Sequence, residues 1–477
     1  MRVHGSEVRG SRDALLSPLH EGRFGRLFRR LQPAPSYGDD QLQQLAEAMR
    51  EQSSSGGWNA SAPIQDGDNP SISAGYTYFG QFLDHDLTFD PVSSFQHQDD
   101  PDALRDFRSP RFDLDSLYGS GPADEPFQYE SVPTGTSTKL LIETNANGVE
   151  DLPRNKQGIA LIGDPRNDEN VVVSQVQLAF LKLHNKLLTE VEPPTAPLSQ
   201  DELQRHQFEA AQRLTRWHYQ WLVAFDFLPK LVGEETMTKV WPKWKQHMDK
   251  PSSPPDIKRR FYKPRNNPYM PVEFSAAAFR FGHSQIRPTY ALNDAVPARP
   301  IFVPGDAVNP GQDLRGFRPR DADSTIDWSL FFPTKQDRTP QPSRLINTRL
   351  SAELFDLPHI GDPDMRMHSL AFRNLKRGQH LALPSGQDVA RATGEQPLTG
   401  SEIGSTLDPT PLWFYILGEA GKAGEGKHLG PVGGRIVAEV LLGLLEIDTR
   451  SFLQAEPTWQ PREDRRTVGA VITDAGA

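Results

Sequence analysis

The sequence predicts a mainly α-helical fold, built as a single large domain with long loops and little β-structure. Apolar residues recur at helical spacing in several segments, whereas runs that alternate like strands are short and few. The 42 prolines and 37 glycines are scattered along the chain, which predicts long irregular connections between helices. The residues suited to chemistry are spread from position 80 to position 377, so they can share one site only within one folded unit.

The predicted helices follow from apolar residues spaced three and four positions apart. They cover residues 39–52, 74–87, 171–190, 201–228, 274–282, 371–375 and 434–445. The length of 477 residues would allow about two or three ordinary domains, but the spread of the chemical segments favours one. We expect residues 1–70 to be an N-terminal extension packed on or wrapping the core, and residues 71–477 to be the functional domain.

Composition excludes several classes of protein. The chain has no cysteine, which rules out disulfides, iron–sulfur clusters and a thiolate-ligated haem. A net charge of −10 and a pI of about 5.8 do not indicate nucleic-acid binding. The start lacks the apolar stretch of a signal peptide, and no run of about 18 apolar residues occurs. We therefore expect a soluble, cytoplasmic protein with no transmembrane segment, export remaining an alternative.

The segment 80–89, Gly-Gln-Phe-Leu-Asp-His-Asp-Leu-Thr-Phe, has two distinct helical faces. Its aromatic and leucine residues share one face, while Gln81, Asp84, His85 and Thr88 share the other. Such a polar stripe is usually a solvated surface. The alternative is a helix buried on both sides whose polar stripe faces a cofactor cavity, and the aromatic flanks favour it.

The segment 109–120 places oxygen-bearing side chains around Asp113 and Asp115. Alternating oxygen ligands suit a hard cation such as calcium. The spacing of an EF-hand and its closing glutamate are missing, and an ordinary aspartate-rich turn is an equally good explanation.

The segment 163–170, Gly-Asp-Pro-Arg-Asn-Asp-Glu-Asn, precedes a long apolar helix. Asn167 or Asp168 would serve as its N-cap, which explains much of this pattern. Arg166 has no part in such a cap, and an arginine at this place is a good donor to a developing anion.

The segment 274–283 is rich in small residues and ends in Gly282-His283. Small residues allow the close approach of a flat group, and histidine is a common haem ligand. A single histidine is more often an ordinary structural residue. The stretch Asn374-Leu-Lys-Arg377 carries no meaning alone.

Together, these segments resemble the peroxidase–cyclooxygenase superfamily of animal haem peroxidases, in the family's order and from about residue 70 to 450. We also expect the chain to be a bacterial member of this superfamily. The resemblance implies a haem b cofactor and a bound calcium ion. On the distal side it implies His85 as the base with Gln81 beside it and Arg166 as the distal arginine, and on the proximal side His283 as the iron ligand and Asn374 as the acceptor of its other ring N–H. Arg280 and Arg377 would pair with the haem propionates, and Asp84 and Glu169 would form ester bonds to haem. The implied calcium ligands are Asp86, Ser109, the Arg111 carbonyl, Asp113 and Asp115.

Two positions depart from well-known members. Asn170 stands where myeloperoxidase-like members have the methionine of a sulfonium link, and Arg280 stands where cyclooxygenases and dioxygenases have a radical tyrosine. The expected function is therefore a peroxidase that reduces hydrogen peroxide and oxidises small organic donors, halides or thiocyanate through a ferryl intermediate. A fatty-acid dioxygenase and a non-catalytic protein that kept the fold are the alternatives. We expect a monomer or homodimer.

Overall fold

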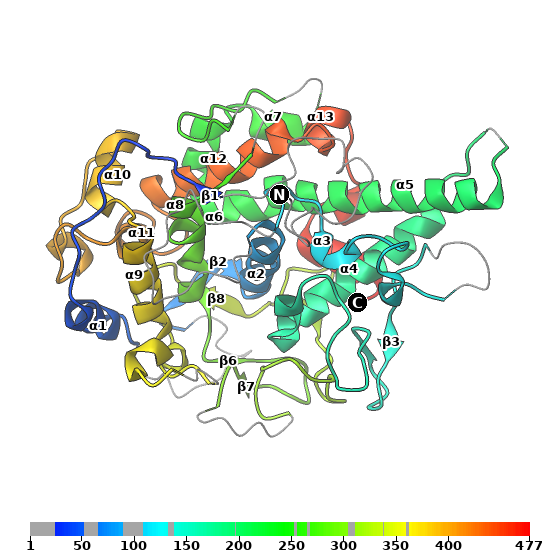
Figure 1. Ribbon diagram of the computed structural model, residues 1–477, viewed down its shortest axis with the longest axis horizontal. Coiled ribbons are helices and arrows are strands. Elements are labelled where there is room, and N and C mark those ends of the chain that lie inside the picture. Colours follow the sequence, from blue (N-terminus) through cyan, green and yellow to red (C-terminus); the bar gives the residue numbers. More distant parts are fainter. Residues whose placement is uncertain are drawn as a thin grey trace, which may run out of the picture.

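The computed structural model describes residues 24–51, 65–88, 108–131, 138–195, 197–251, 255–264, 268–303, 311–336, 338–358 and 362–477. Helices dominate this part of the chain, which confirms the predicted mainly α fold (Figure 1). The α-helices are α1 (Asp39–Ala48), α2 (Gly75–Leu87), α3 (Asp115–Tyr118), α4 (Val171–Glu190), α5 (Gln200–Trp221), α6 (Leu228–Val240), α7 (Trp244–Asp249), α8 (Val272–Ser275), α9 (Leu370–His380), α10 (Gly386–Thr393), α11 (Leu412–Ala423), α12 (Pro431–Ile447), α13 (Phe452–Ala455) and α14 (Val468–Ala475).

The strands of the described residues are two to six residues long and form two-stranded sheets only. The pairs are β1 (Phe24–Gly25) with β5 (Met270–Pro271), β2 (Asp68–Ser73) with β8 (Pro342–Arg344), β3 (Glu143–Thr144) with β4 (Glu150–Asp151), and β6 (Thr289–Tyr290) with β7 (Arg299–Pro300). Long loops join these elements, as the scattered prolines predict. Among the described residues, no helix is both long and apolar enough to cross a bilayer.

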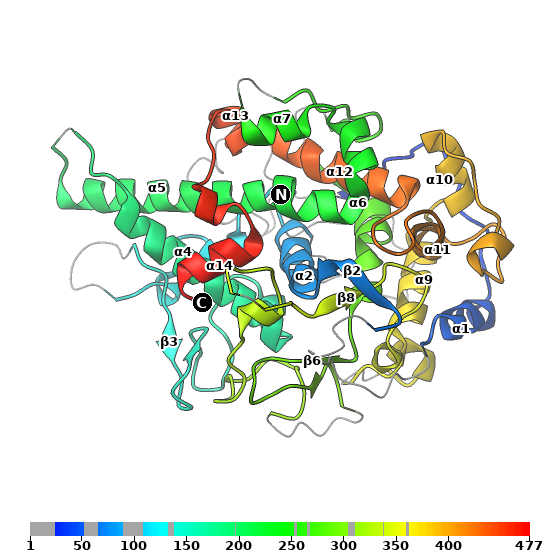
Figure 2. The same cartoon turned by 180° about the vertical axis from the view of Figure 1, so that it is seen from behind.

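Helix α5 and the first part of α6 form a long rod across the molecule, joined by a π-helical turn at Leu222–Phe227, and α6 bends away at Gly233 (Figure 2). The sequence pattern predicted one helix over 201–228 and missed α6. The wider turn buries Asp226, which accepts hydrogen bonds from the Tyr76 hydroxyl of α2 and the Val468 N–H of α14. The turn therefore fixes two other helices against the rod.

Helix α2 lies inside the molecule, between the rod and the loops (Figures 1 and 2). The Phe82 ring packs against Phe180 of α4 at a centroid distance of 5.1 Å and against Tyr219 of α5 at 5.9 Å. On the other face, the His85 side chain is also buried. This helix is thus buried on both sides, as the aromatic flanks indicated.

Helix α4 spans the predicted residues 171–190, but its predicted N-cap is wrong. The cap is Asn170, whose side chain accepts the Val172 N–H at 2.8 Å. Asn167 and Asp168 belong instead to a preceding 3-10 turn, Pro165–Asp168, which Asp164 caps by accepting the Arg166 N–H.

The predicted helix over 274–282 is also wrong. Helix α8 ends at Ser275, and a separate 3-10 segment runs from Ala278 to Gln285. Ala277 has φ −135° and ψ −72°, outside the helical region, and the Arg280 Nε donates to the Ser275 carbonyl oxygen at 3.0 Å. This side-chain bond occupies a carbonyl that a continuous helix would use, so the chain turns here.

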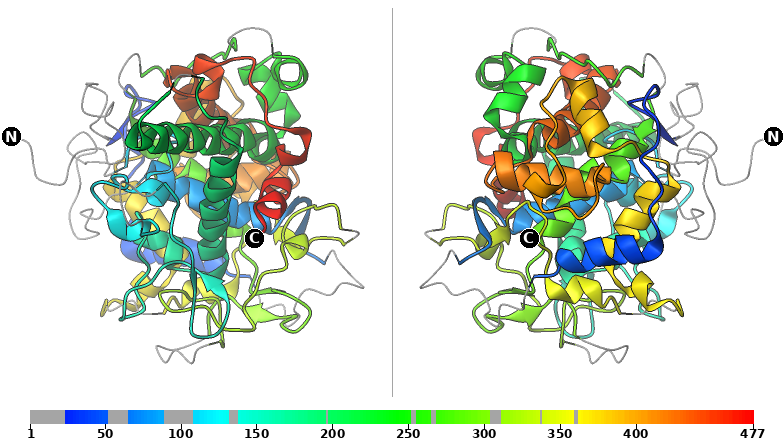
Figure 3. Two further views of the ribbon diagram at one scale, coloured as in Figure 1. Left: turned by 90° about the vertical axis from the view of Figure 1, so that its right-hand side faces the viewer. Right: turned by 90° about the vertical axis from the view of Figure 1, so that its left-hand side faces the viewer.

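Residues 24–48 lie against α8, which precedes the segment that carries His283, and against α9, which carries Asn374. The buried Glu273 carboxylate accepts the backbone N–H groups of Leu27 and Phe28 at 3.0 and 3.2 Å, and α1 packs beside α9 (Figure 3). Within the predicted extension 1–70, residues 1–23 and 52–64 lie outside the described residues. Phe89, the last residue of the segment 80–89, also lies outside them. The domain boundary at residue 70 stays a prediction.

His184 gives this fold a testable pH dependence. Its buried ring bonds the Tyr118 hydroxyl at 3.0 Å and the Thr138 carbonyl at 2.9 Å, and burial lowers its pKa to about 4. As the pH is lowered from 6.5 to 4, this histidine is protonated in the unfolded chain but stays neutral in the folded chain. The free energy of unfolding therefore decreases as the pH is lowered through this window. We expect this histidine to contribute a loss of about 3 kcal/mol. Chemical unfolding of H184Q across this range should show a correspondingly weaker pH dependence, and an unchanged dependence would contradict this role of His184.

Candidate active site

His85 is held by a buried amide that the sequence did not single out for this purpose. Its Nδ1 lies 2.7 Å from Oδ1 of Asn167, and its Nε2 lies 3.6 Å from Oε1 of Glu169. Burial, with the nearby charge of Arg166, lowers the pKa of His85 to about 3. The ring is therefore neutral near pH 7 and its Nε2 side faces the group of Gln81 and Glu169, which hydrogen-bond to each other.

Arg166 is fixed by Asp164 and by the end of α2. Its Nη2 donates to the Asp164 carboxylate at 2.8 Å and to the carbonyl oxygens of His85 and Thr88 at 3.0 and 2.7 Å. Burial alone would raise the pKa of Asp164, but the guanidinium groups of Arg166 and Arg108 outweigh it and lower the pKa. The Asp164 carboxylate is thus a stable anionic anchor for Arg166.

His283 and Asn374 meet across two elements, the 3-10 segment and α9. Nδ1 of His283 lies 2.8 Å from Nδ2 of Asn374, while Oδ1 of Asn374 accepts from Arg280 Nη1 at 3.4 Å. The expected pairing has the amide oxygen facing the ring, so the observed contact has the opposite orientation. Burial, followed by the charge of Arg280, lowers the pKa of His283 to about 3, which leaves the imidazole neutral and able to bind a metal.

The two groups of residues face a shared interior. Arg280 acts electrostatically on Asp84 of α2, and Arg166 acts on both of them. Asp84, Glu169, Arg280 and His283 lie deep within the molecule, yet each keeps part of its surface accessible. We infer from these two properties that the four side chains border an internal hollow, where a cofactor would lie. Burial raises the pKa of Glu169 to about 7 and also raises that of Asp84.

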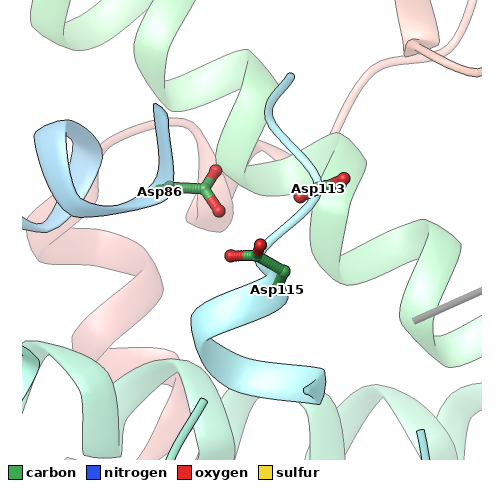
Figure 4. A group of neighbouring side chains, drawn as sticks. All are labelled: Asp86, Asp113 and Asp115. Atoms are coloured by element: carbon green, nitrogen blue, oxygen red, sulfur yellow. The ribbon is translucent and has the colours of Figure 1, made fainter. Parts of the chain in front are cut away.

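Three buried aspartates converge beside this region (Figure 4). One oxygen from each of Asp86, Asp113 and Asp115 lies within 4.8 Å of the others. Leu114 adopts the left-handed conformation, φ 55°, where the loop enters α3, and its flanking aspartates both reach Asp86. The Asp86 side chain is fully buried, and Arg108 and the Tyr219 hydroxyl favour its charged form.

The charges of this cluster are only partly balanced. The Arg108 Nη1 lies 2.8 Å from Asp115 Oδ1, and the Ser109 hydroxyl donates to Asp113 at 2.6 Å. Burial, and then the neighbouring carboxylates, raise the pKa of Asp86 well above its usual range; burial raises that of Asp115 to about 6. A divalent cation would relieve the repulsion between these carboxylates. The residues therefore fit a calcium ion.

Arg108 joins this cluster to the anchor of Arg166. Its Nη2 lies 2.6 Å from Asp164 Oδ2, and its side chain is only 9% exposed. The loop that carries Asp164 and Arg166 also contacts the aspartate cluster. At Gly163 of this loop, an added Cβ would lie 2.3 Å from the Asp115 carbonyl oxygen. Sequence reasoning missed Arg108, Asp164 and Asn167, although all three lie next to predicted site residues. No local pattern distinguishes them from ordinary loop residues.

Comparison with known proteins identifies the family. The model of the animal haem peroxidase family matches residues 108–402, more than half of the chain. Pig thyroid peroxidase is 23% identical over 381 residues, covering 70% of this chain and 37% of its own length, and Drosophila melanogaster peroxidasin is 25% identical over 360 residues, covering 68% and 21%. The chain thus spans well under half of these relatives.

Solved structures share the fold. Peroxidase A from Dictyostelium discoideum superposes with a TM-score of 0.63 at 15% identity, covering 96% of this chain and 93% of its own. Arabidopsis thaliana fatty acid alpha-dioxygenase superposes with a TM-score of 0.56 at 17% identity, covering 95% and 76%. These named relatives come from eukaryotes, so they lend no support to a bacterial origin. The chain belongs to the animal haem peroxidase family.

Proposed function

We propose that this protein is a haem peroxidase that reduces hydrogen peroxide and oxidises small organic donors, halides or thiocyanate. The arrangement that supports the proposal is a neutral His85 whose Nδ1 contacts Asn167 and whose Nε2 lies on the side of Glu169, together with a neutral, deeply buried His283. A base on one side and a metal ligand on the other is the arrangement that peroxide chemistry at haem requires.

His283 would bind the haem iron through Nε2. That bond requires Nδ1 to carry the ring proton. The Asn374 side-chain amide must therefore flip by 180° so that its Oδ1 accepts the Nδ1 proton. Arg280, which holds that oxygen at 3.4 Å, would then be available to a haem propionate together with Arg377. Asp84 and Glu169 line the same hollow and are the carboxylates proposed to form ester bonds. Haem would supply the redox-active iron and store the oxidising equivalents.

The chain's own residues would manage the proton and the charge of hydrogen peroxide. His85 would accept a proton from one peroxide oxygen at Nε2 and return it to the other, so that water leaves. Arg166 would stabilise the negative charge that develops on the departing oxygen. Gln81 would help to orient the small molecule beside His85. Asn167 and Asp164 hold the two acting side chains in place.

We also propose that calcium binds between Asp86, Asp113 and Asp115, with the Ser109 hydroxyl and the Arg111 carbonyl as further ligands. Asp86 is the residue after His85, so the ion would stiffen the end of α2 as well as join it to the loop.

Calcium removal should destabilise the protein. Stripping the ion leaves three buried carboxylates in mutual repulsion, and a ligand present at about 1,000 times its Kd contributes about 4 kcal/mol. We expect chelation to lower the Tm by about 5 °C, and D86N to have a low Tm that calcium no longer raises. The control D364N removes an exposed carboxylate and should respond to calcium like the wild type. A wild-type Tm that is indifferent to calcium would contradict the site.

The fatty-acid dioxygenase alternative is favoured only by the shared fold, and Arg280 stands where its radical tyrosine is expected. Two assays separate the functions: peroxide-dependent oxidation of guaiacol, bromide or thiocyanate, and oxygen uptake with linoleate or arachidonate without peroxide. We expect activity in the first and none in the second. Oxygen uptake without peroxide would overturn the proposal, and a haem-supplied protein without a Soret band would favour a non-catalytic protein.

A further inference from the structure

A chain of buried hydrogen bonds leads from the backbone of α3 to the ring of His85. Gln177 Nε2 donates to the Ser116 carbonyl oxygen at 3.0 Å, and Gln177 Oε1 accepts from Asn167 Nδ2 at 2.9 Å. Asn167 Oδ1 then lies 2.7 Å from His85 Nδ1. Ser116, Asn167 and Gln177 are fully buried, and His85 is 5% exposed.

The direction of each bond in this chain is determined by its first member. A backbone carbonyl oxygen can only accept, so it must face the NH2 group of Gln177. The Gln177 oxygen therefore faces Asn167 and must receive that residue's NH2 group. The Asn167 oxygen is then left for the ring, and an oxygen can bond Nδ1 only if Nδ1 carries the proton. Nε2 of the neutral ring is consequently the unprotonated nitrogen.

We propose that Asn167 and Gln177 are positioning residues that set the tautomer of His85, and so decide which ring nitrogen can act as a base. The proposal rests on the proposed peroxidase function. It gives Asn167 a use outside the helix, because Asn170 already caps α4. Gln177 lies two turns into α4, and a helical side chain leans towards the N-terminus, which brings its amide back to Asn167.

The opposite tautomer would disable the base. If Asn167 lost its fixed orientation, its NH2 group could face Nδ1, and Nε2 would then carry a proton. Such a ring cannot accept a proton from peroxide. For a metal-bound histidine, loss of the partner that orients the ring typically costs about 10–100-fold, and we expect a loss of this order for His85.

The test compares N167L with N167D in the haem-loaded protein. Leucine cannot accept the Nδ1 proton, whereas a carboxylate accepts it and keeps the tautomer, although burying it should destabilise the fold. Two readouts are the association rate of cyanide, which enters as HCN and must lose a proton, and the rate of reaction with peroxide. Carbon monoxide binding to the ferrous protein is the control, because it carries no proton.

We expect N167L to slow cyanide and peroxide by about 10–100-fold and to leave carbon monoxide unchanged. N167D should react faster than N167L despite a lower Tm, because its carboxylate still accepts the Nδ1 proton. Q177L, which frees the Asn167 amide to turn, should fall between the two and keeps the test decisive if N167L does not fold. Equal cyanide rates in the wild type and either leucine variant, or equal losses in N167L and N167D, would overturn the proposal. A wild type that binds no haem would instead count against the peroxidase function.

Discussion

H283A is expected to fold but to bind haem at least about 100-fold more weakly than the wild type, because even losing a hydrogen-bond partner of a metal ligand typically costs about 10–100-fold. The ring of His283 is neutral and deeply buried, so it is the residue that would bind the haem iron. Titration of haem-free protein with haemin, without peroxide, and acid–acetone extraction of the product would measure the affinity and show whether any haem is covalently held.

The matched control for this variant is H206A, which removes a half-buried histidine of α5 far along the chain from the proposed ligand. It should bind one haem per chain with the wild-type spectrum. Stoichiometric binding with an unaltered Soret band in H283A would show that the iron takes its ligand elsewhere, and the proximal assignment would be wrong.

H85A is expected to keep its haem and to react with hydrogen peroxide about 10²–10⁴-fold more slowly, the usual contribution of a positioned acid–base group. The ring has no metal to hold in this proposal, so haem content should not change. Stopped-flow measurement of the spectral change on adding peroxide would give the rate constant directly.

Two further observations would separate lost chemistry from lost structure in H85A. Carbon monoxide should bind the ferrous variant as it binds the wild type, and added imidazole should restore part of the peroxide rate by entering the space that the ring left. A variant that reacts with peroxide as fast as the wild type would refute the role of His85 as the base.

The sequence predicted long, strongly patterned helices well. Helix α4 has its predicted ends because a long apolar run is bounded by a capping asparagine and by the polar residues that follow. Helix α2 was predicted to within one residue, and its aromatic face correctly indicated burial on both sides. Helices α6, α10, α11 and α14 were missed. Helix α11 is apolar nearly all round, so it has no periodic contrast to recognise.

The errors near the site have a common physical cause, which is that side chains replaced local backbone bonds. Arg280 takes the carbonyl of Ser275 and breaks the predicted helix. Asn167 was assigned to a cap because asparagine commonly serves as one, but its amide is used by a histidine 82 positions earlier. Contacts between such distant residues depend on the whole fold, and spacing along the chain does not reveal them.

We propose that His85 and His283 flank one haem, with His283 as the ligand of its iron. Resonance Raman spectroscopy of the ferrous protein tests this most directly, through the iron–imidazole stretching band. We predict that the band is present in the wild type, persists in H85A and is absent from H283A reconstituted with excess haem. A band that survives in H283A, or that disappears in H85A, would show that His283 is not the ligand of the iron.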